Sequence, residues 1–209
     1  MHRKPTTARR ALVCACILAC SFYFYGFVPN LFSDTRPLPE DTGALHLYQL
    51  LTKLHTTARI MHTLAHPDDE DGGMMTLEAR GHGATVLLFT VNRGEGGQNK
   101  FGAESSDDLG ILRTLELLQA DKYYGVEQRF AGVIDFGYSK TAEETFNKWH
   151  GHDVALGDMV RVIRTFRPDV LISRFQGSKI DGHGNHEASG VLTREARVRN
   201  SRAPGRPWA

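Results

Sequence analysis

The sequence of 209 residues predicts an α/β protein with a mainly parallel sheet. Apolar runs of strand length at 60–65, 83–91 and 169–175 each lead into a polar or glycine-bearing segment, and helix-like segments separate them. A strand, a helix and a second strand at this spacing form a βαβ unit, whose two strands are parallel. Hydrophobic residues make up 41% of the chain, which is enough for one domain with a core.

The composition narrows the classes of function. Lys and Arg number 25 and Asp and Glu 24, so the net charge of +1 gives no electrostatic basis for nucleic-acid binding or for broad binding to a membrane surface. All three cysteines lie within the first twenty residues. The predicted core therefore has neither a disulfide framework nor a cysteine-based zinc site.

The first 28 residues are typical of a signal peptide or a signal anchor. Residues 1–10 carry four basic and no acidic side chains, and residues 11–28 are uncharged and largely apolar. The apolar run, about 18 residues long, lies at the border between a cleaved signal and a membrane-spanning helix. Lipidation at Cys20 is an alternative, although Leu18 is bulky for a lipoprotein cleavage box. We expect export, to a periplasmic location or to a membrane-anchored position outside the cytoplasm.

Residues 29–56 are interpreted as a linker followed by a leading helix. Prolines and acidic side chains dominate 29–43, whereas the spacing of apolar residues over 44–54 predicts an amphipathic helix, with Leu45, Tyr48, Leu51 and Leu54 on one face. The core is expected over 57–197. Arginine, proline and glycine dominate the last residues, so 198–209 is predicted to be a disordered tail.

Within the core, the first strand ends before Pro67, because proline cannot donate a ladder hydrogen bond. A helix is predicted over 71–80 with Gly81 as its stop, and a second strand over 83–91. A helix to about residue 120 has Ile111, Leu115 and Leu118 as its apolar stripe. A short strand is expected within 132–136, helices over 141–149 and 153–166, and a strand over 169–175.

Two polar loops carry histidines and carboxylates. The first places one imidazole and three carboxylates in the five residues 66–70, and the second carries His183 and His186. Because carboxyl ends of parallel strands meet at one edge of a sheet, these loops are expected to meet. His66, Asp69 and His186 then form a two-histidine, one-carboxylate site, which zinc commonly takes in hydrolytic sites.

The same loops offer groups for proton transfer. Asp68 lies beside the predicted ligands with a free carboxylate, which is placed to accept a proton from a water molecule. His183 is suited to polarising a carbonyl oxygen or to protonating a leaving amine.

Each pattern also has a structural interpretation. Histidines three residues apart in a loop are often only solvated, an acidic run is common at a helix N-terminus, and the glycines of 94–97 mark a tight loop. Without a following Lys-Ser/Thr pair, that loop is not a phosphate loop. The remaining histidines have no partner pattern and are interpreted as structural: His2, His46, His55, His62, His82, His150 and His152.

The segment Ala-His-Pro-Asp-Asp-Glu at 65–70, followed by a second strand with a glycine-rich loop and then by His-Xaa-Xaa-His, resembles the LmbE-like (PIG-L) family of zinc-dependent N-deacetylases. The resemblance covers roughly 57–197. The glycine-rich loop (90–99) and the segment 181–190 further resemble the large exported bacterial branch of this family.

The resemblance implies a Rossmann-like three-layer fold and removal of acetyl groups from amino sugars of the N-acetylglucosamine type, as small molecules or glycoconjugates. It implies that His66, Asp69 and His186 bind Zn²⁺, that Asp68 is the general base, and that His183 stabilises the tetrahedral intermediate. Arg93 and Glu95 are candidates for binding substrate.

The chain departs from the family pattern in two ways. Many members carry Asp or His immediately before the last ligand, where this chain has Asn185, so the orientation of His183 or His186 is expected to differ. Members also continue beyond this point, so we expect a core that is incomplete at the C-terminus. A metal-binding fragment without turnover is therefore the alternative function, and ester cleavage at the same metal is a third.

Overall fold

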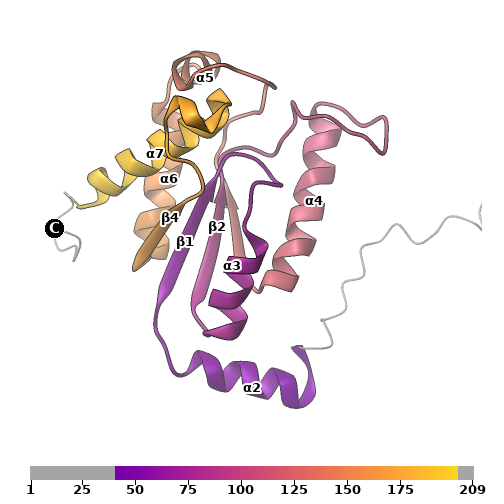
Figure 1. Ribbon diagram of the computed structural model, residues 1–209, viewed down its shortest axis with the longest axis vertical. Helices are drawn as coiled ribbons and strands as arrows, with labels where there is room; N and C mark the ends of the chain where they lie inside the picture. The colour runs from indigo at the N-terminus through magenta and orange to yellow at the C-terminus, as the bar shows by residue number, and fades with distance from the viewer. Residues whose placement is uncertain (1–40, 202–209) are drawn as a thin grey trace, which may run out of the picture. The chain divides into compact units, whose positions relative to one another are not determined.

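The computed structural model describes residues 41–201 (Figure 1). The predicted signal segment at 1–28, most of the linker and residues 202–209 lie outside the described part of the chain. Four strands form one sheet: β1 (Arg59–Leu64), β2 (Thr85–Thr90), β3 (Glu127–Phe130) and β4 (Val170–Ser173). Their order is β3-β2-β1-β4 and every neighbouring pair is parallel, which confirms the predicted fold class.

Helices cover both faces of the sheet, so the fold has three layers (Figure 1). One layer holds α5 (Ala142–Lys148), α6 (Asp153–Phe166) and α7 (Gly184–Ser201), and the other holds α3 (Gly72–Thr76) and α4 (Asp107–Tyr124). Successive side chains of β1 point to opposite faces of the sheet. Met61 therefore packs with the α5–α7 layer and Leu64 with the α3–α4 layer. Both faces of β1 are thus buried.

The α6 helix was predicted with its correct bounds and buried face. Met159, Val160, Ile163 and Phe166 are all buried against the sheet. Their spacing places them on one side of the helix, so the periodic pattern was sufficient.

The predicted apolar stripe of α4 is wrong. Ile111, Leu115 and Leu118 are exposed, whereas Leu109 and Leu117 are buried on the opposite side. Apolar residues are distributed around this helix, so periodicity alone did not select the buried face. The helix predicted over 71–80 is also interrupted: α3 is followed by a π-helical turn, η2 (Leu77–Gly81), which ends at the predicted glycine.

The short strand predicted within 132–136 is wrong. The third strand is β3, a sequence of Glu-Gln-Arg-Phe that pairs with β2 at the edge of the sheet. An edge strand exposes one side to solvent and so tolerates polar residues, which left no apolar signal. Residues 132–136 instead form the loop that follows β3.

The leading helix is present as α2 (Gly43–Lys53), but its apolar side is not buried. Leu45, Tyr48, Leu51 and Leu54 are all exposed, together with Leu47 and Leu50. The predicted helix is therefore confirmed, and it contacts the domain through polar groups, among them Gln49, which accepts a hydrogen bond from Arg80.

The predicted disordered tail begins too early. Helix α7 continues to Ser201, and Asn200 is buried near its end. Arginine is a good helix former, so the arginine-rich residues at 197–199 extend the helix instead of ending it. In the described range 41–201, no helix is both long and apolar enough to cross a membrane.

Candidate active site

The loop after β1 forms one half of the site. His66 is buried, and its backbone N–H donates to Asp69 Oδ2 at 2.7 Å. The same oxygen lies 3.2 Å from His66 Nδ1, so one carboxylate fixes both the backbone and the ring of His66. Between them, Asp68 has a φ of 114°, a value that is strained for a non-glycine residue and is typical of functional loops.

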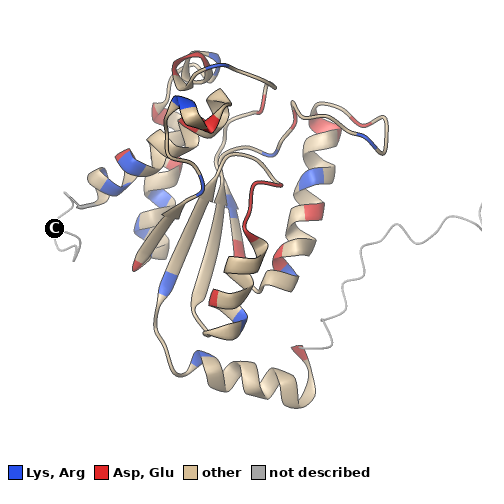
Figure 2. Ribbon diagram, viewed as in Figure 1, with Lys and Arg blue, Asp and Glu red and all other residues tan. Residues whose placement is uncertain are grey.

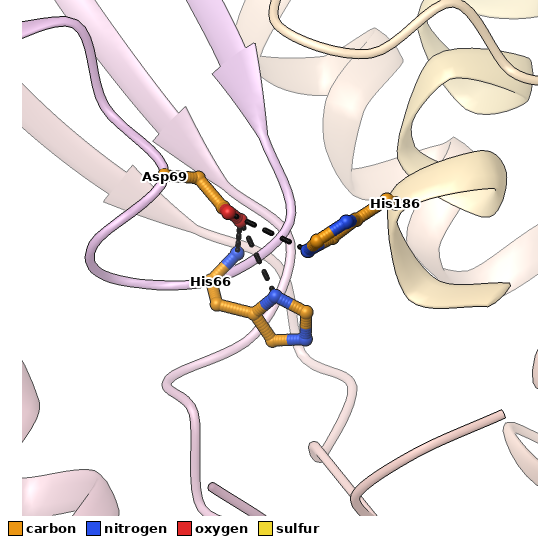
Figure 3. Close-up of side chains that lie close together, drawn as sticks. All are labelled: His66, Asp69 and His186. Carbon is orange, nitrogen blue, oxygen red and sulfur yellow. Dashed lines mark hydrogen bonds and ion pairs between the residues drawn. The ribbon is translucent and has the colours of Figure 1, made fainter. Parts of the chain in front are cut away.

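The first turn of α7 supplies the other half. Figure 3 shows the His186 ring directed toward Asp69, with its Nε2 atom 3.4 Å from Asp69 Oδ1. His186 Nδ1 lies 3.3 Å from the carbonyl oxygen of Asp181, and donating its proton there leaves the lone pair on Nε2. Phe175 stacks on the ring at 4.0 Å and holds its plane.

These three side chains fit a metal ion. One ligand atom from each of His66, Asp69 and His186 lies within 4.8 Å of the other two, which makes them a group suited to a metal. The far ring nitrogen of His66, Nε2, lies 3.9 Å from the buried carboxylate of Asp135. Histidines that bind metals commonly have such a carboxylate behind the ring.

The electrostatics favour an ionised ligand carboxylate. Burial by itself raises the pKa of Asp69, but the hydrogen bonds and charge of His66, together with His186, bring the pKa below its usual value. Asp69 is therefore ionised at neutral pH and ready to bind a cation.

Asp68 is held by an arginine from α4. Arg113 Nη2 lies 2.6 Å from Asp68 Oδ2, and the same guanidinium donates to the carbonyl oxygens of Pro67 and Gly94. Partial burial raises the pKa of Asp68, and the positive charge of Arg113 opposes that rise. Arg113 thus pairs with a largely exposed carboxylate that lies beside the candidate metal site.

His183 lies next to both ligand histidines, with ring centroids 5.2 Å from His66 and 4.9 Å from His186. Burial, reinforced by these two rings, lowers the pKa of His183 to about 4. The backbone N–H of Asn185 donates to His183 Nδ1 at 3.1 Å. At neutral pH His183 is therefore a neutral imidazole whose proton is on Nε2, which makes it a hydrogen-bond donor.

Asn185, the residue at which a departure from the expected pattern was predicted, is fully buried behind His66. Its side-chain Nδ2 lies 3.2 Å from His66 Nε2 and donates to Asp135 Oδ1 at 3.1 Å. Asn185 thus contacts His66 through its side chain and His183 through its backbone N–H.

All five predicted metal-binding and catalytic residues line one cavity of about 470 Å³. Arg93 and Glu95 are not among the residues that line it. Glu95 is buried, pairs with Arg93 Nε at 2.8 Å and accepts from the backbone N–H of Asp135 at 3.1 Å. The role of Arg93 and Glu95 in substrate binding stays a prediction, and their contacts support the loop that carries Asp135.

Further residues that line the cavity were missed, among them Arg113, Asp135 and Tyr138. Asp135 follows the apolar pair 133–134, so an acid after a short apolar run was an available signal. Arg113 lies in the middle of a helix and Tyr138 in an irregular loop, and neither belongs to a cluster of polar residues. Only the fold brings them to the cavity.

The sequence profile of the family described as GlcNAc-PI de-N-acetylase (PIG-L) matches residues 61–197, well over half of the chain. A 1D-myo-inositol 2-acetamido-2-deoxy-alpha-D-glucopyranoside deacetylase of Frankia casuarinae is 32% identical over 157 residues, which are 67% of this chain and 50% of that protein. The mycothiol S-conjugate amidase of Streptomyces coelicolor is 30% identical over 125 residues, which are 54% of this chain and 43% of that protein.

Solved structures share the fold at low sequence identity. The N,N'-diacetylchitobiose deacetylase of Pyrococcus horikoshii superposes with a TM-score of 0.51 at 16% identity, covering 80% of this chain and 61% of that chain. The 4-carboxy-2-hydroxymuconate hydratase of Pseudomonas putida gives 0.51 at 19% identity, covering 72% and 59%. A deacetylase and a hydratase thus share this architecture, so the fold alone does not select the reaction.

The chain spans about half the length of the curated relatives it matches. The match of the family profile includes most of the parallel sheet and both loops of the site. The chain belongs to the GlcNAc-PI de-N-acetylase (PIG-L) family.

Proposed function

We propose that this protein is a zinc-dependent hydrolase that removes the acetyl group from an N-acetylated amino sugar of the N-acetylglucosamine type. The observation that carries the proposal is the convergence of His66, Asp69 and His186, with Asp68 and His183, on one cavity. The family membership supports the same chemistry.

The names of the relatives support the class of bond and substrate. The Frankia protein is a deacetylase of a 2-acetamido-2-deoxy-glucopyranoside, and the Streptomyces protein is an amidase. Both names describe cleavage of an amide C–N bond outside a peptide. An acetamido sugar is therefore the first substrate class to test.

His66, Asp69 and His186 would hold the zinc ion. Bound zinc supplies Lewis acidity, which lowers the pKa of a water molecule and polarises the amide carbonyl. Asp68 accepts the proton of the attacking water as the new C–O bond forms. The C–N bond then breaks as the protonated Asp68 returns this proton to the amine nitrogen, and the products are acetate and a free amino sugar.

His183 has a separate role in this scheme. Its neutral ring keeps a proton on Nε2 and donates a hydrogen bond to the carbonyl oxygen as negative charge develops there. Because the pKa of His183 is about 4, little imidazolium is present at neutral pH to protonate the leaving amine. The contacts therefore favour oxyanion stabilisation over general-acid catalysis.

The first 28 residues support a location outside the cytoplasm, either periplasmic or anchored to the membrane and facing outward. We include this location in the proposal because four basic residues precede an uncharged apolar run.

The test is acetate release by the zinc-loaded chain from a panel of acetamido sugars, with the corresponding acetate esters as comparison. The matched control is zinc-loaded Asp68→Asn, which keeps the size of the side chain and removes the base. We expect the parent to release acetate from an acetamido sugar and the variant to be slower by about 10² to 10⁴.

Equal rates for the parent and the Asp68→Asn variant would contradict the mechanism. A folded chain that binds zinc and releases no acetate would favour the alternative of a metal-binding fragment without turnover. Release from esters alone would favour ester hydrolysis.

A further inference from the structure

The α2 helix presents its large apolar side chains to solvent. Tyr48 is 67% exposed and Leu54, directly after the helix, is 81% exposed. The other large apolar residues of the helix are also exposed: Leu45, Leu47, Leu50 and Leu51. No residue of α2 is buried. A helix that only covers a core turns such residues inward.

Polar groups attach α2 to the domain. Arg80 Nη1 donates to Gln49 Oε1 at 3.1 Å and to Asp41 Oδ1 at 2.9 Å. Near the end of the helix, the carbonyl of Thr52 lies so close to Gly83 that a Cβ there would be 2.6 Å from the oxygen. The helix is thus fixed with its polar side inward and its leucines outward.

Few charges lie around α2, and the acidic Asp41, just before the helix, is paired with Arg80 at 2.9 Å. Residues 42–67 contain no Asp or Glu, and the only charged residue within the helix is Lys53, in its last turn. Figure 2 shows the middle of α2 free of charged side chains. Exposed leucines and a tyrosine with a basic residue beside them are typical of a helix that lies in a membrane interface.

The sequence before α2 also favours a membrane as the partner of this helix. Residues 11–28 are apolar and uncharged, and 14 residues separate them from Gly43. An extended linker of this length spans at most about 50 Å, so a membrane-inserted run would keep α2 within reach of the bilayer surface.

A second copy of the chain is a poorer occupant. Helix α2 has 11 residues and is therefore roughly 16 Å long. A face of roughly 16 by 10 Å is small beside the roughly 800 Å² that each partner buries in a stable protein interface. A lipid interface has no such minimum area, because single amphipathic helices bind it.

We propose that α2 is an interfacial helix whose leucines and Tyr48 insert into the surface of a bilayer that contains anionic lipid. In Figure 1, α2 lies at the end of the sheet where β1 begins, and the candidate active site lies at the carboxyl ends of the strands. Strands of six residues place these ends about 20 Å apart. The helix therefore holds the catalytic cavity at a fixed height above the membrane.

The test places an indole on α2 in the full chain and measures its quenching by lipids. The variant Tyr48→Trp is reconstituted in phosphatidylcholine–phosphatidylglycerol vesicles whose acyl chains carry bromine, and the emission of the parent tryptophans is subtracted. The matched control is Phe101→Trp, because Phe101 is fully exposed on the loop before α4. A third variant adds Leu47→Glu and Leu51→Glu to Tyr48→Trp.

We expect quenching in Tyr48→Trp to exceed that in Phe101→Trp by at least about twofold, and the added glutamates to abolish the difference while circular dichroism is unchanged. This readout distinguishes α2 from the apolar N-terminal run, which is present in every variant. Equal quenching at the two positions, or quenching that survives the glutamates, would overturn the proposal. A dimer that shields the helix, seen by sedimentation without lipid, would overturn it as well.

Discussion

At the scale of single residues, Arg113 determines where the carboxylate of Asp68 lies. The guanidinium pairs with Asp68 and donates to two backbone carbonyls of the surrounding loops. A Cβ at Gly94 or Gly97 would lie within 2.6 Å of Arg113 Nη1, so a larger residue at either position would displace the guanidinium. Arg113 acts on the reaction through Asp68, so it is a positioning residue.

The variant Arg113→Gln is therefore expected to lower kcat by about 10²-fold while the zinc content stays the same. Steady-state kinetics of acetate release measures this change. Arg129→Gln serves as the control, because the side chain of Arg129 is exposed and pairs with the exposed Glu127 at 3.3 Å. A change in KM alone, with kcat unchanged, would show that Arg113 does not position the base.

The protonation state of His183 leads to a second prediction at this scale. A pKa of about 4 means that the ring loses its extra proton well below neutral pH, so it stays neutral from about pH 6 to about pH 9. Removal of this donor in His183→Ala should lower kcat by about 10² to 10³. The ratio of kcat between parent and variant should be constant across that pH range. A ratio that falls tenfold for each pH unit would instead identify His183 as a titrating acid.

At the scale of elements, α4 carries a test of the corrected packing. Leu117 is buried against the α3–α4 side of the sheet, and Leu115, two residues away, is 56% exposed. Leu117→Ala should reduce the free energy of unfolding by about 2 to 5 kcal/mol. Leu115→Ala should change it by less than about 0.5 kcal/mol. Chemical denaturation of both variants measures these free energies of unfolding. Equal reductions in the two variants would contradict the burial of Leu117 and the exposure of Leu115.

The same helix holds a buried carboxylate that lacks a hydrogen-bond partner. Both oxygens of Asp121 are unpaired within the described part of the chain. Burial, with the charge of Glu70 nearby, raises its pKa from 3.8 to about 7. In the unfolded chain this group ionises near pH 4, so between about pH 4 and about pH 7 the folded state keeps a proton that the unfolded state loses.

Stability therefore falls as the pH rises through this window, because the folded state binds more protons. We expect Asp121→Asn to remove roughly 1 to 3 kcal/mol of that decline between about pH 5 and about pH 8. Unfolding free energies of parent and variant at the two pH values measure the difference. Parallel pH profiles would show that Asp121 ionises in the folded state as easily as in water.

At the scale of the whole molecule, the sheet was predictable where the strands are buried on both faces. The strand β2 is mostly apolar and β1 is largely buried, whereas the edge strand β3 is polar. The other edge strand, β4, keeps the apolar sequence Val-Leu-Ile and was predicted. Apolar residues on both sides of α4 hid its buried face. The outward-facing leucines of α2 had the same spacing as an inward-facing stripe, so the sequence could not tell the two apart.

The candidate site was predictable to a similar degree. His66, Asp68 and Asp69 are adjacent in the chain, and His183 and His186 are three residues apart, so each loop had a local pattern. Arg113 and Asp135 reach the cavity singly from distant parts of the chain. Their positions follow from the packing of α4 and of the loop after β3, which no local pattern specifies.

The most direct test of the proposed metal site is the zinc content of the full chain, measured by mass spectrometry on the parent and on the His66→Ala, His186→Ala double variant. Circular dichroism of both proteins controls for folding. We expect one zinc ion per folded parent chain and none in a variant that remains folded, because the loop after β1 and the first turn of α7 would hold a single ion between them. A folded parent without zinc, or a variant that keeps the ion, would contradict the metal site and the hydrolytic mechanism that depends on it.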